Sequence, residues 1–322
     1  YYLLNRYKEE LGDEAAFAFD TASPLTILSE NLLPDDWKTM ADCIRKRFTP
    51  AYSGIIITHG TDTLAYTACA MAFMLAGLPV PVVLVSSNYP PEDERSNAYA
   101  NFRAALDFIR DAALPGVYTL FEQDGGMQGF LGSRLGQARP YTDSFSSVTG
   151  VPLGIMRNGR FCRTEHVDNP SVEQLRQAPV QALKVFPALR SCVQYIRPYP
   201  GIDYSRLSMP TSVRAVYHGL YHSGTACVRL EAAGTAAGNT SFSTFAQTCG
   251  KRGQQVYISP IWKDEAVYAS ARSMSDNVEV LPPMSEEAAY VKLLLAYNLY
   301  AEHQEQRDAF IREEQAFEYL HF

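Results

Sequence analysis

The strongest folding signal in the chain is the run Ile55-Ile56-Ile57-Thr58, which follows Gly54. An uninterrupted β-branched run is typical of a strand that is buried on both faces of a parallel sheet. Helical spacing of apolar residues predicts a helix before it, over residues 35–47. Further helices and strands alternate after it, over residues 64–76, 80–87, 93–112 and 116–121. Alternation of this kind predicts an α/β fold with a doubly wound parallel sheet.

A change in composition divides the chain. Residues 168–188 are rich in Pro and Gln and contain few long apolar runs, which is typical of a linker. We therefore expect a larger, flavodoxin- or Rossmann-like N-terminal domain over residues 1–167 and a smaller α/β domain over residues 189–322. The second domain is expected to contain strands over residues 192–196, 213–220 and 256–259, and a helix with Ser285 as its N-cap.

Charge and cysteine content exclude several classes of protein. The net charge is -7, and no cluster of five Lys or Arg residues occurs, which disfavours a nucleic-acid partner and an anionic membrane surface. The uncharged run from Thr63 to Pro91 contains four prolines, so a membrane span is not expected. The chain start does not resemble a signal peptide. Six widely spaced cysteines without a CxxC pair indicate free thiols in a reducing compartment, hence a cytoplasmic location.

Polar residues follow the first two predicted strands, at the sheet edge where α/β proteins bind ligands. His59-Gly60-Thr61-Asp62-Thr63 follows the isoleucine run, and Ser87 follows the strand over residues 80–87. An activated Thr hydroxyl is a nucleophile and Asp62 can hold an ammonium group, but Thr61 or Asp62 could equally cap the next helix. Ser87 could belong to an ordinary loop. Ser29-Glu30-Asn31 form a third polar cluster, for which capping of the helix over residues 35–47 is the alternative.

Two weaker motifs do not indicate a site. His218 and His222 are four residues apart in a predicted strand and loop, where that spacing does not favour a metal site. Asp124-Gly125-Gly126 lacks the spacing of a dinucleotide-binding loop. Neither a metal site at these histidines nor a dinucleotide site is therefore expected.

Residues 54–68 resemble the second signature of the bacterial-type L-asparaginases, the asparaginase/glutaminase family, nearer its cytoplasmic type I branch. Further similarity to this family occurs in residues 24–37, 87–101, 199–202 and 284–293. The resemblance implies two α/β domains and hydrolysis of L-asparagine to L-aspartate and ammonia through an acyl-threonine, without a cofactor. It also implies a homodimer or homotetramer.

The resemblance also assigns roles to individual residues. Thr61 is expected to be the second catalytic threonine, and Asp62 to bind the substrate amino group. Ser29 is expected to bind the α-carboxylate, with Glu30 near the amino group. Ser87 is expected to line the amide end of the substrate.

Three departures from the family pattern are evident. Gln137 stands where the family has a catalytic Lys, Asn97 replaces an Asp, and the Thr-Gly-Gly-Thr loop that carries the first threonine is not found. We expect that the first strand of the sheet is missing from the chain as given, which would leave an unpaired apolar edge. Two alternatives remain open: a non-catalytic amino-acid-binding protein of the same fold, and an amidotransferase-type relative.

Overall fold

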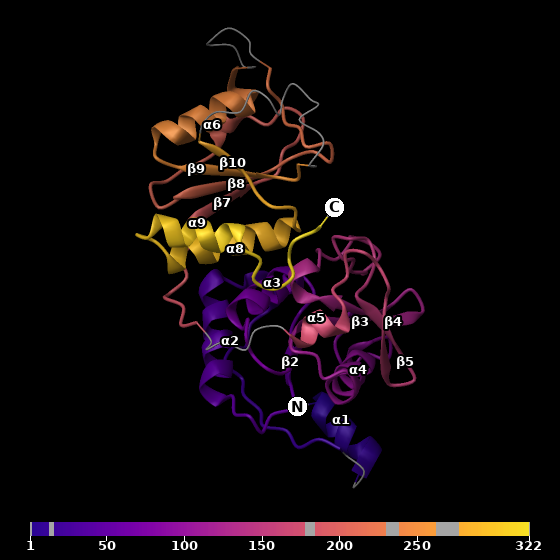
Figure 1. Ribbon diagram of the computed structural model, residues 1–322. Helices are drawn as coiled ribbons and strands as arrows, with labels where there is room; N and C mark the ends of the chain where they lie inside the picture. Colours follow the sequence, from indigo (N-terminus) through magenta and orange to yellow (C-terminus); the bar gives the residue numbers. More distant parts are fainter. Residues whose placement is uncertain (1, 13–15, 178–183, 230–237, 262–276, 322) are drawn as a thin grey trace. The chain divides into compact units, whose positions relative to one another are not determined.

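The computed structural model describes residues 2–12, 16–177, 184–229, 238–261 and 277–321 (Figure 1). They form two compact units, which we treat separately. Unit 1 comprises Tyr1–Phe186 with Gln315–Phe317, and unit 2 comprises Pro187–Glu314 with Glu318–Phe322. Among the helices in the described ranges, none combines the length and apolar character that crossing a bilayer requires.

Unit 1 is built on a six-stranded sheet with the order β1-β2-β3-β4-β5-β6. The strands are β1 (Ile55–Thr58), β2 (Pro81–Val85), β3 (Gly116–Gln123), β4 (Gly126–Leu131), β5 (Gly154–Arg157) and β6 (Arg160–Arg163). The first three are parallel, as the sequence predicted, whereas β3 to β6 pair antiparallel. The antiparallel strands β4 to β6 lie in a part of the chain for which no strand was predicted.

Two tight turns explain two of the three antiparallel pairs, β3–β4 and β5–β6. Asp124-Gly125 joins β3 to β4, and Asn158-Gly159 joins β5 to β6. All four residues have positive φ, between 51° and 75°, as a type I′ hairpin turn requires. The Gly-rich stretch after residue 123 thus forms a hairpin.

Helices cover both faces of this sheet. They are α1 (Tyr2–Leu11), α2 (Pro34–Arg47), α3 (Leu64–Met74), α4 (Ala98–Asp111) and α5 (Val172–Arg176), with the 3-10 turns η2 (Ser29–Asn31) and η3 (Gly132–Arg134). The α4 helix begins at Ala98 rather than at Asp93, because the residues before Ala98 form a turn. In this turn the Ser96 hydroxyl donates to the Tyr89 carbonyl, and Asp93 pairs with Arg95. The short α5 helix lies in the region predicted as a linker, with Leu175 buried; residues 178–183 of that region lie outside the described residues.

The position of β1 differs from the prediction of burial on both faces. All five residues of β2 are buried, whereas the three isoleucines of β1 are only partly buried and Thr58 is exposed. The reason is that β1 is an edge strand: it pairs with β2, and no described strand pairs with its other edge.

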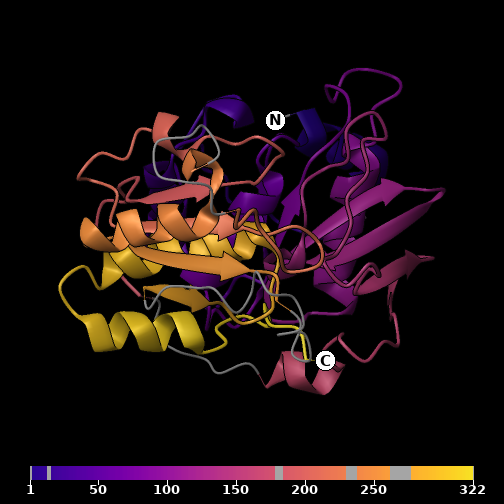
Figure 2. The ribbon, with the colours of Figure 1, turned by 90° about the horizontal axis from the view of Figure 1, so that it is seen from above.

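Unit 2 contains a four-stranded parallel sheet with the order β10-β9-β8-β7. Its elements are β7 (Val193–Ile196), η4 (Tyr204–Arg206), β8 (Ala215–Gly219), η5 (Gly238–Thr240), α6 (Phe242–Lys251), β9 (Gln255–Ser259), β10 (Val278–Val280), α8 (Glu286–Leu299) and α9 (Gln304–Arg312). The α6 helix covers one face of this sheet, and α8 and α9 lie on the other (Figures 1 and 2).

The α8 helix is more enclosed than its sequence suggested. Ser285 caps it as predicted, because its hydroxyl accepts the Ala288 N–H at 3.1 Å. Every residue from Val291 to Tyr297 is buried, including Lys292, so no solvent-facing stripe exists along this stretch. The Lys292 side chain is 1% exposed, and its ammonium pairs with the carboxylate of the fully buried Glu318. It also donates to the Tyr319 hydroxyl at 2.6 Å.

Candidate functional site

The polar residues that follow β1 and β2 emerge at one edge of the unit 1 sheet. Thr58, the last residue of β1, is in register with Val85, the last of β2. The His59 N–H donates to the Val85 carbonyl at 2.9 Å, which extends the pairing by one residue. The loop from His59 to Thr63 therefore begins beside the loop that contains Ser87, at the carboxyl ends of parallel strands.

Ser29 and Asp62 meet across this edge although 33 residues separate them. The Ser29 hydroxyl donates to Asp62 Oδ2 at 3.1 Å, and the Thr63 hydroxyl donates to the Ser29 carbonyl at 2.9 Å. Ser29 is 8% exposed, whereas Asp62 is exposed. A carboxylate has about four lone-pair positions, so Asp62 can bind an ammonium group while it accepts from Ser29.

The side chains of Ser29, Thr61 and Asp62 do not cap the helices that follow them. The N-cap of α3 is Thr63, which makes no side-chain capping bond, and the N-cap of α2 is Leu33, whose N–H donates to Asp36 Oδ2 at 2.7 Å. The capping alternative for Thr61, Asp62 and Ser29 is therefore wrong. Thr61 is half-buried, and its hydroxyl has no hydrogen-bond partner among the residues that the structure describes.

Gly60 permits the close contact between the two loops. A Cβ atom at this position would lie 2.4 Å from Ser29 Oγ and 2.9 Å from Ser29 Cβ, closer than side chains approach one another. Any larger residue would displace Ser29 from Asp62. The glycine is therefore required here for space.

A chain of buried hydrogen bonds fixes the orientation of His59. Trp37 Nε1–H donates to the Thr67 hydroxyl at 3.0 Å, and that hydroxyl lies 2.9 Å from His59 Nε2. Because the hydroxyl oxygen accepts from Trp37, its proton is available for His59 Nε2. His59 Nδ1 then carries the ring proton and donates to the Gly60 carbonyl at 2.7 Å. Burial lowers the pKa of His59, which favours this neutral form.

The other predicted site residues are less closely connected. Ser87 donates to the Tyr89 carbonyl at 2.7 Å, within its own loop, and no hydrogen bond among the described residues joins it to Ser29, Thr61 or Asp62. Glu30 is exposed on η2. The structure thus brings Ser29 and Asp62 together, with Thr61 adjacent in the chain. Glu30 and Ser87 make no hydrogen bond to these three residues among the described residues.

The substitution at position 97 has a structural reason. The Asn97 amide donates to the Glu122 carbonyl at 3.1 Å, and its side-chain oxygen accepts the Asn88 N–H at 3.1 Å. A carboxylate could accept but not donate, so the Asp that the family has here could not link the two loops in this way. Gln137 is half-buried in the loop after η3.

His218 does not contribute to a metal cluster. It is fully buried in β8 of unit 2, with Nε2 2.8 Å from the Tyr204 hydroxyl and its ring packed against Phe242. Burial lowers its pKa to about 4. Among the described residues, no group of three or more His, Cys, Asp and Glu side chains could hold a metal ion.

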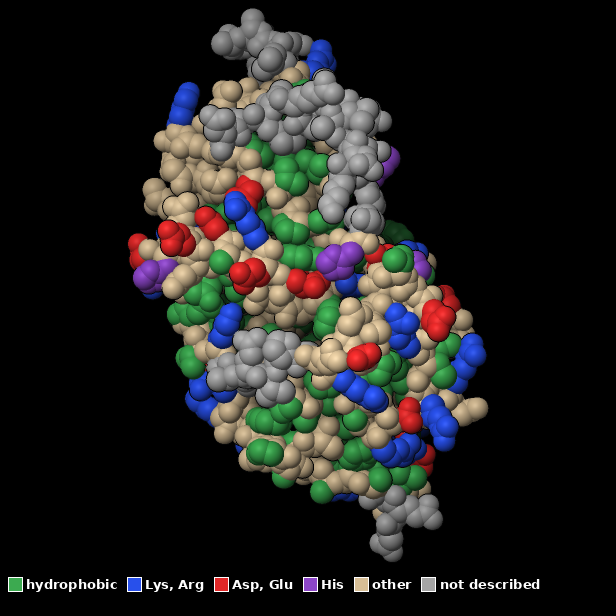
Figure 3. Space-filling model, viewed as in Figure 1, with side chains coloured by type: hydrophobic (Ala, Val, Ile, Leu, Met, Phe, Trp, Pro, Cys, Tyr) green, Lys and Arg blue, Asp and Glu red, His purple; other side chains and the backbone are tan. Residues whose placement is uncertain are grey.

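On the face that Figure 3 shows, basic side chains of unit 1 are interspersed with acidic ones. This distribution agrees with the absence of Lys and Arg clusters in the sequence. On this face, therefore, we find no continuous basic surface of the kind that binds a phosphate backbone.

Comparison with known families shows which family this chain belongs to. The model of the N-terminal asparaginase domain matches residues 5–166. The chain belongs to the asparaginase family. The matched residues include η2, β1 and the loop from His59 to Thr63, so the candidate site lies within the family domain.

Two curated relatives of this asparaginase-family chain bear different names. An L-asparaginase from Thermococcus kodakarensis is 43% identical over 102 residues, which is 32% of this chain and 30% of the relative. A glutamyl-tRNA(Gln) amidotransferase subunit from Methanococcus maripaludis is 33% identical over 211 residues, which is 62% of this chain and 47% of the relative. The chain thus spans under half the length of either curated relative.

Solved structures share the fold over most of the chain. The thermostable L-asparaginase from Thermococcus kodakarensis has a TM-score of 0.72 and 25% identity, covering 92% of this chain and 85% of its own. L-asparaginase I from Vibrio cholerae has a TM-score of 0.73 and 24% identity, covering 95% and 87%. These similarities agree with the two α/β units described above.

Proposed function

We propose that this chain is an amidohydrolase that converts L-asparagine to L-aspartate and ammonia through a threonine acyl-enzyme. The observation that carries the proposal is the hydrogen bond from Ser29 to Asp62, which assembles a hydroxyl and a carboxylate at the carboxyl edge of the sheet. Membership of the asparaginase family supports the same class of reaction.

The site offers complementary groups for an α-amino acid. Asp62 is exposed and negatively charged, so it can pair with the substrate α-ammonium group. The Ser29 hydroxyl can bind the α-carboxylate, and Glu30 adds negative charge near the ammonium group. We assign Ser87, in the neighbouring loop, to the amide end of the substrate. These roles are part of the proposal.

In the reaction, a threonine hydroxyl oxygen attacks the side-chain amide carbon, and the amide nitrogen leaves as ammonia after it has gained a proton. Water then cleaves the resulting ester, which releases L-aspartate and restores the hydroxyl. Thr61 and Thr63 flank Asp62 in the chain. The Thr63 hydroxyl is bonded to the Ser29 carbonyl, whereas the Thr61 hydroxyl has no hydrogen-bond partner among the described residues. We assign Thr61 and Asp62 to the catalytic centre, where the Thr61 hydroxyl acts on the nucleophile or on water.

Ammonia release from L-asparagine tests the proposal. We expect turnover by the unmodified chain and its loss in Thr61→Ala and Asp62→Ala, with Thr39→Ala on the exposed surface of α2 as the matched control. Binding of L-aspartate by calorimetry should persist in Thr61→Ala and disappear in Asp62→Ala. Saturable binding without product in the unmodified chain would instead identify an amino-acid-binding protein of this fold.

The relatives named as glutamyl-tRNA(Gln) amidotransferase subunits support a second candidate, a chain that produces ammonia for another protein. These relatives match a larger share of this chain than the L-asparaginase does. A stable protein partner in a pull-down, with ammonia release that rises when the partner is present, would favour this candidate. Release from free L-asparagine by the isolated chain would favour the asparaginase.

The setting that we propose is cytoplasmic, with a homodimer or homotetramer as the active form. A structural neighbour from Campylobacter jejuni is described as a probable cytoplasmic L-asparaginase. All six cysteines are free thiols, as a reducing compartment would maintain them. Light scattering coupled to size-exclusion chromatography would determine the number of subunits.

A further inference from the structure

Two asparagine side chains bridge the ends of β2 and β3, where the two strands no longer pair. The regular pairing of β2 with β3 ends at Leu84 and Thr119. Beyond it, Asn101 of α4 donates to the Ser86 carbonyl at 2.9 Å and accepts the Glu122 N–H at 2.8 Å. A side-chain amide donates and accepts as a peptide group does, so it can take the place of a strand between two others.

Asn97 makes the second bridge, one helical turn before Asn101. Its side chain donates to the Glu122 carbonyl at 3.1 Å and accepts the Asn88 N–H at 3.1 Å. Asn97 is the N-cap of α4, a position at which Asn usually accepts an N–H of the helix, yet it makes no capping bond to that helix. Its side chain is used to hold the loop after β2 instead.

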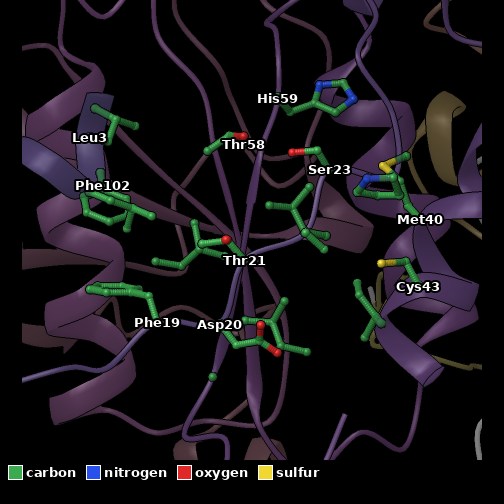
Figure 4. Close-up of a pocket in the computed structure, with 18 of the residues that line it drawn as sticks. Leu3, Phe19, Asp20, Thr21, Ser23, Met40, Cys43, Thr58, His59 and Phe102 are labelled. Carbon is green, nitrogen blue, oxygen red and sulfur yellow. The ribbon is translucent and has the colours of Figure 1, made fainter. Parts of the chain in front are cut away.

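The two bridges determine which way Ser87 faces. The Val85 carbonyl points toward β1, because it accepts the N–H of His59, which follows that strand (Figure 4). The bonds of Ser86 and Asn88 to the asparagines point the other way, toward α4 and β3. Since the peptide groups of successive strand residues alternate between the two edges, those of Ser87 lie on the β1 side, where the candidate site is.

We propose that Asn97 is a positioning residue of the substrate site, which holds the loop of residues 86–88 so that Ser87 faces the loop that contains Thr61 and Asp62. This role rests on the proposed function, which assigns Ser87 to the amide end of the substrate. Asn101 is fully buried and supports the same loop from inside the fold. Asn97 is half-buried, so it can be replaced without opening the core.

Asn97→Asp would make this bridge depend on pH. An ionised Asp accepts the Asn88 N–H but cannot donate, so its second oxygen and the Glu122 carbonyl would be two acceptors facing each other. A protonated Asp has a donor and restores both hydrogen bonds. Asp93 and Arg95 of the preceding turn pair with each other, and the Glu122 side chain is exposed. These charges are present in the unmodified chain too, so the ratio of variant to unmodified chain at one pH isolates position 97.

Ammonia release from L-asparagine by the full chain tests the proposal at about pH 7.5, far above the ordinary pKa of Asp, and at about pH 4.5, near it. At the higher pH, we expect Asn97→Asp to lower kcat/KM by about tenfold or more, because a donor is lost and two acceptors are brought together. At the lower pH, kcat/KM should recover to within about threefold of the unmodified chain. Asn97→Leu, which can neither donate nor accept, should show the same loss at both pH values.

Asn158→Asp is the matched control. It makes the same substitution at an exposed position of the turn between β5 and β6, where Asp-Gly also suits a type I′ turn. We expect this variant to match the unmodified chain at both pH values.

Amide exchange of the chain, labelled with ¹⁵N at Asn and Ser, gives a readout that does not depend on turnover. In the unmodified chain the Asn88 N–H should exchange more slowly than the Ser87 N–H, which neither asparagine holds. Asn97→Asp should reduce the protection of Asn88 by about tenfold at the higher pH and restore it at the lower one.

Unchanged kcat/KM in Asn97→Asp would overturn the proposal, and so would a loss of equal size at both pH values, which is what a merely structural role predicts. Should the unmodified chain neither release ammonia nor bind L-aspartate, the proposed function fails, and the exchange of Asn88 alone decides whether Asn97 holds the loop. Should Asn97→Leu not fold, the comparison of Asn97→Asp with Asn158→Asp decides.

Discussion

Replacement of Thr67 by Val should destabilise unit 1 out of proportion to the single atom that changes. The Thr67 side chain is fully buried and its hydroxyl joins Trp37 to His59. Valine has the same shape but cannot hydrogen-bond, so Trp37 Nε1–H and His59 Nε2 would both lose their partner inside the protein. Each buried polar group left unsatisfied costs about 1–3 kcal/mol, so for the two groups we expect a loss of about 2–6 kcal/mol. This is a large share of the roughly 5–15 kcal/mol by which a domain is stable.

Urea unfolding followed by tryptophan fluorescence measures this loss, with Thr67→Ser as the matched control. Serine keeps the hydroxyl and removes one methyl group, for which we expect about 1 kcal/mol. Equal losses in the two variants would show that packing, and not the hydrogen-bond chain, stabilises the loop.

A second readout is the pH dependence of the free energy of unfolding. The pKa of His59 is lower in the folded state than in the unfolded state. The contribution of His59 to the free energy of unfolding is therefore fully present above about pH 6.5, and it is lost as the pH falls below this value. Thr67→Val should weaken this dependence, since the neutral ring would lose its donor.

Three further results are expected. Lys292→Met removes the cation that pairs with buried Glu318, and it should cost about 3–5 kcal/mol in thermal unfolding; the double variant with Glu318→Leu should recover most of this, and a cost below about 1 kcal/mol in the single variant would contradict the reasoning. His218 has a folded pKa of about 4, below its unfolded value, so unit 2 should lose up to about 3 kcal/mol as the pH falls from 6.5 to 4; His218→Phe should unfold with a flatter pH profile, and an unchanged profile would argue against this. Gly60→Ala should weaken L-aspartate binding by about 10- to 100-fold, because the new Cβ would displace Ser29 from Asp62 and break a hydrogen bond to a charged group; calorimetry would measure it, and wild-type affinity would show that Ser29 is not needed.

The sequence predicted the helices and strands themselves better than it predicted what packs beside each of them. The Ile55–Thr58 run identified a strand correctly, but its composition could not show that β1 lies at an edge, because edge and centre differ only in what packs alongside. The Ser29–Asp62 contact joins residues far apart in the chain, and only the family resemblance placed them together. His59 was recognised as polar and near the site, yet its link to Thr67 depends on how α3 packs. The hairpins were not predicted, although Asp124-Gly125 and Asn158-Gly159 are dipeptides that type I′ turns favour and could have indicated them.

Those two hairpins also bear on how fast unit 1 can fold. Each of them pairs strands that are adjacent in sequence and separated by two residues, so their contacts are local and their closure costs little entropy. The parallel pairs β1–β2 and β2–β3 each require a helix to form between the strands, and contacts of such sequence separation slow folding. We therefore expect the antiparallel half of the sheet to form early and to serve as the template on which β2, and lastly β1, is added. In stopped-flow exchange labelling, the amides of β3 and β4 should become protected before those of β1.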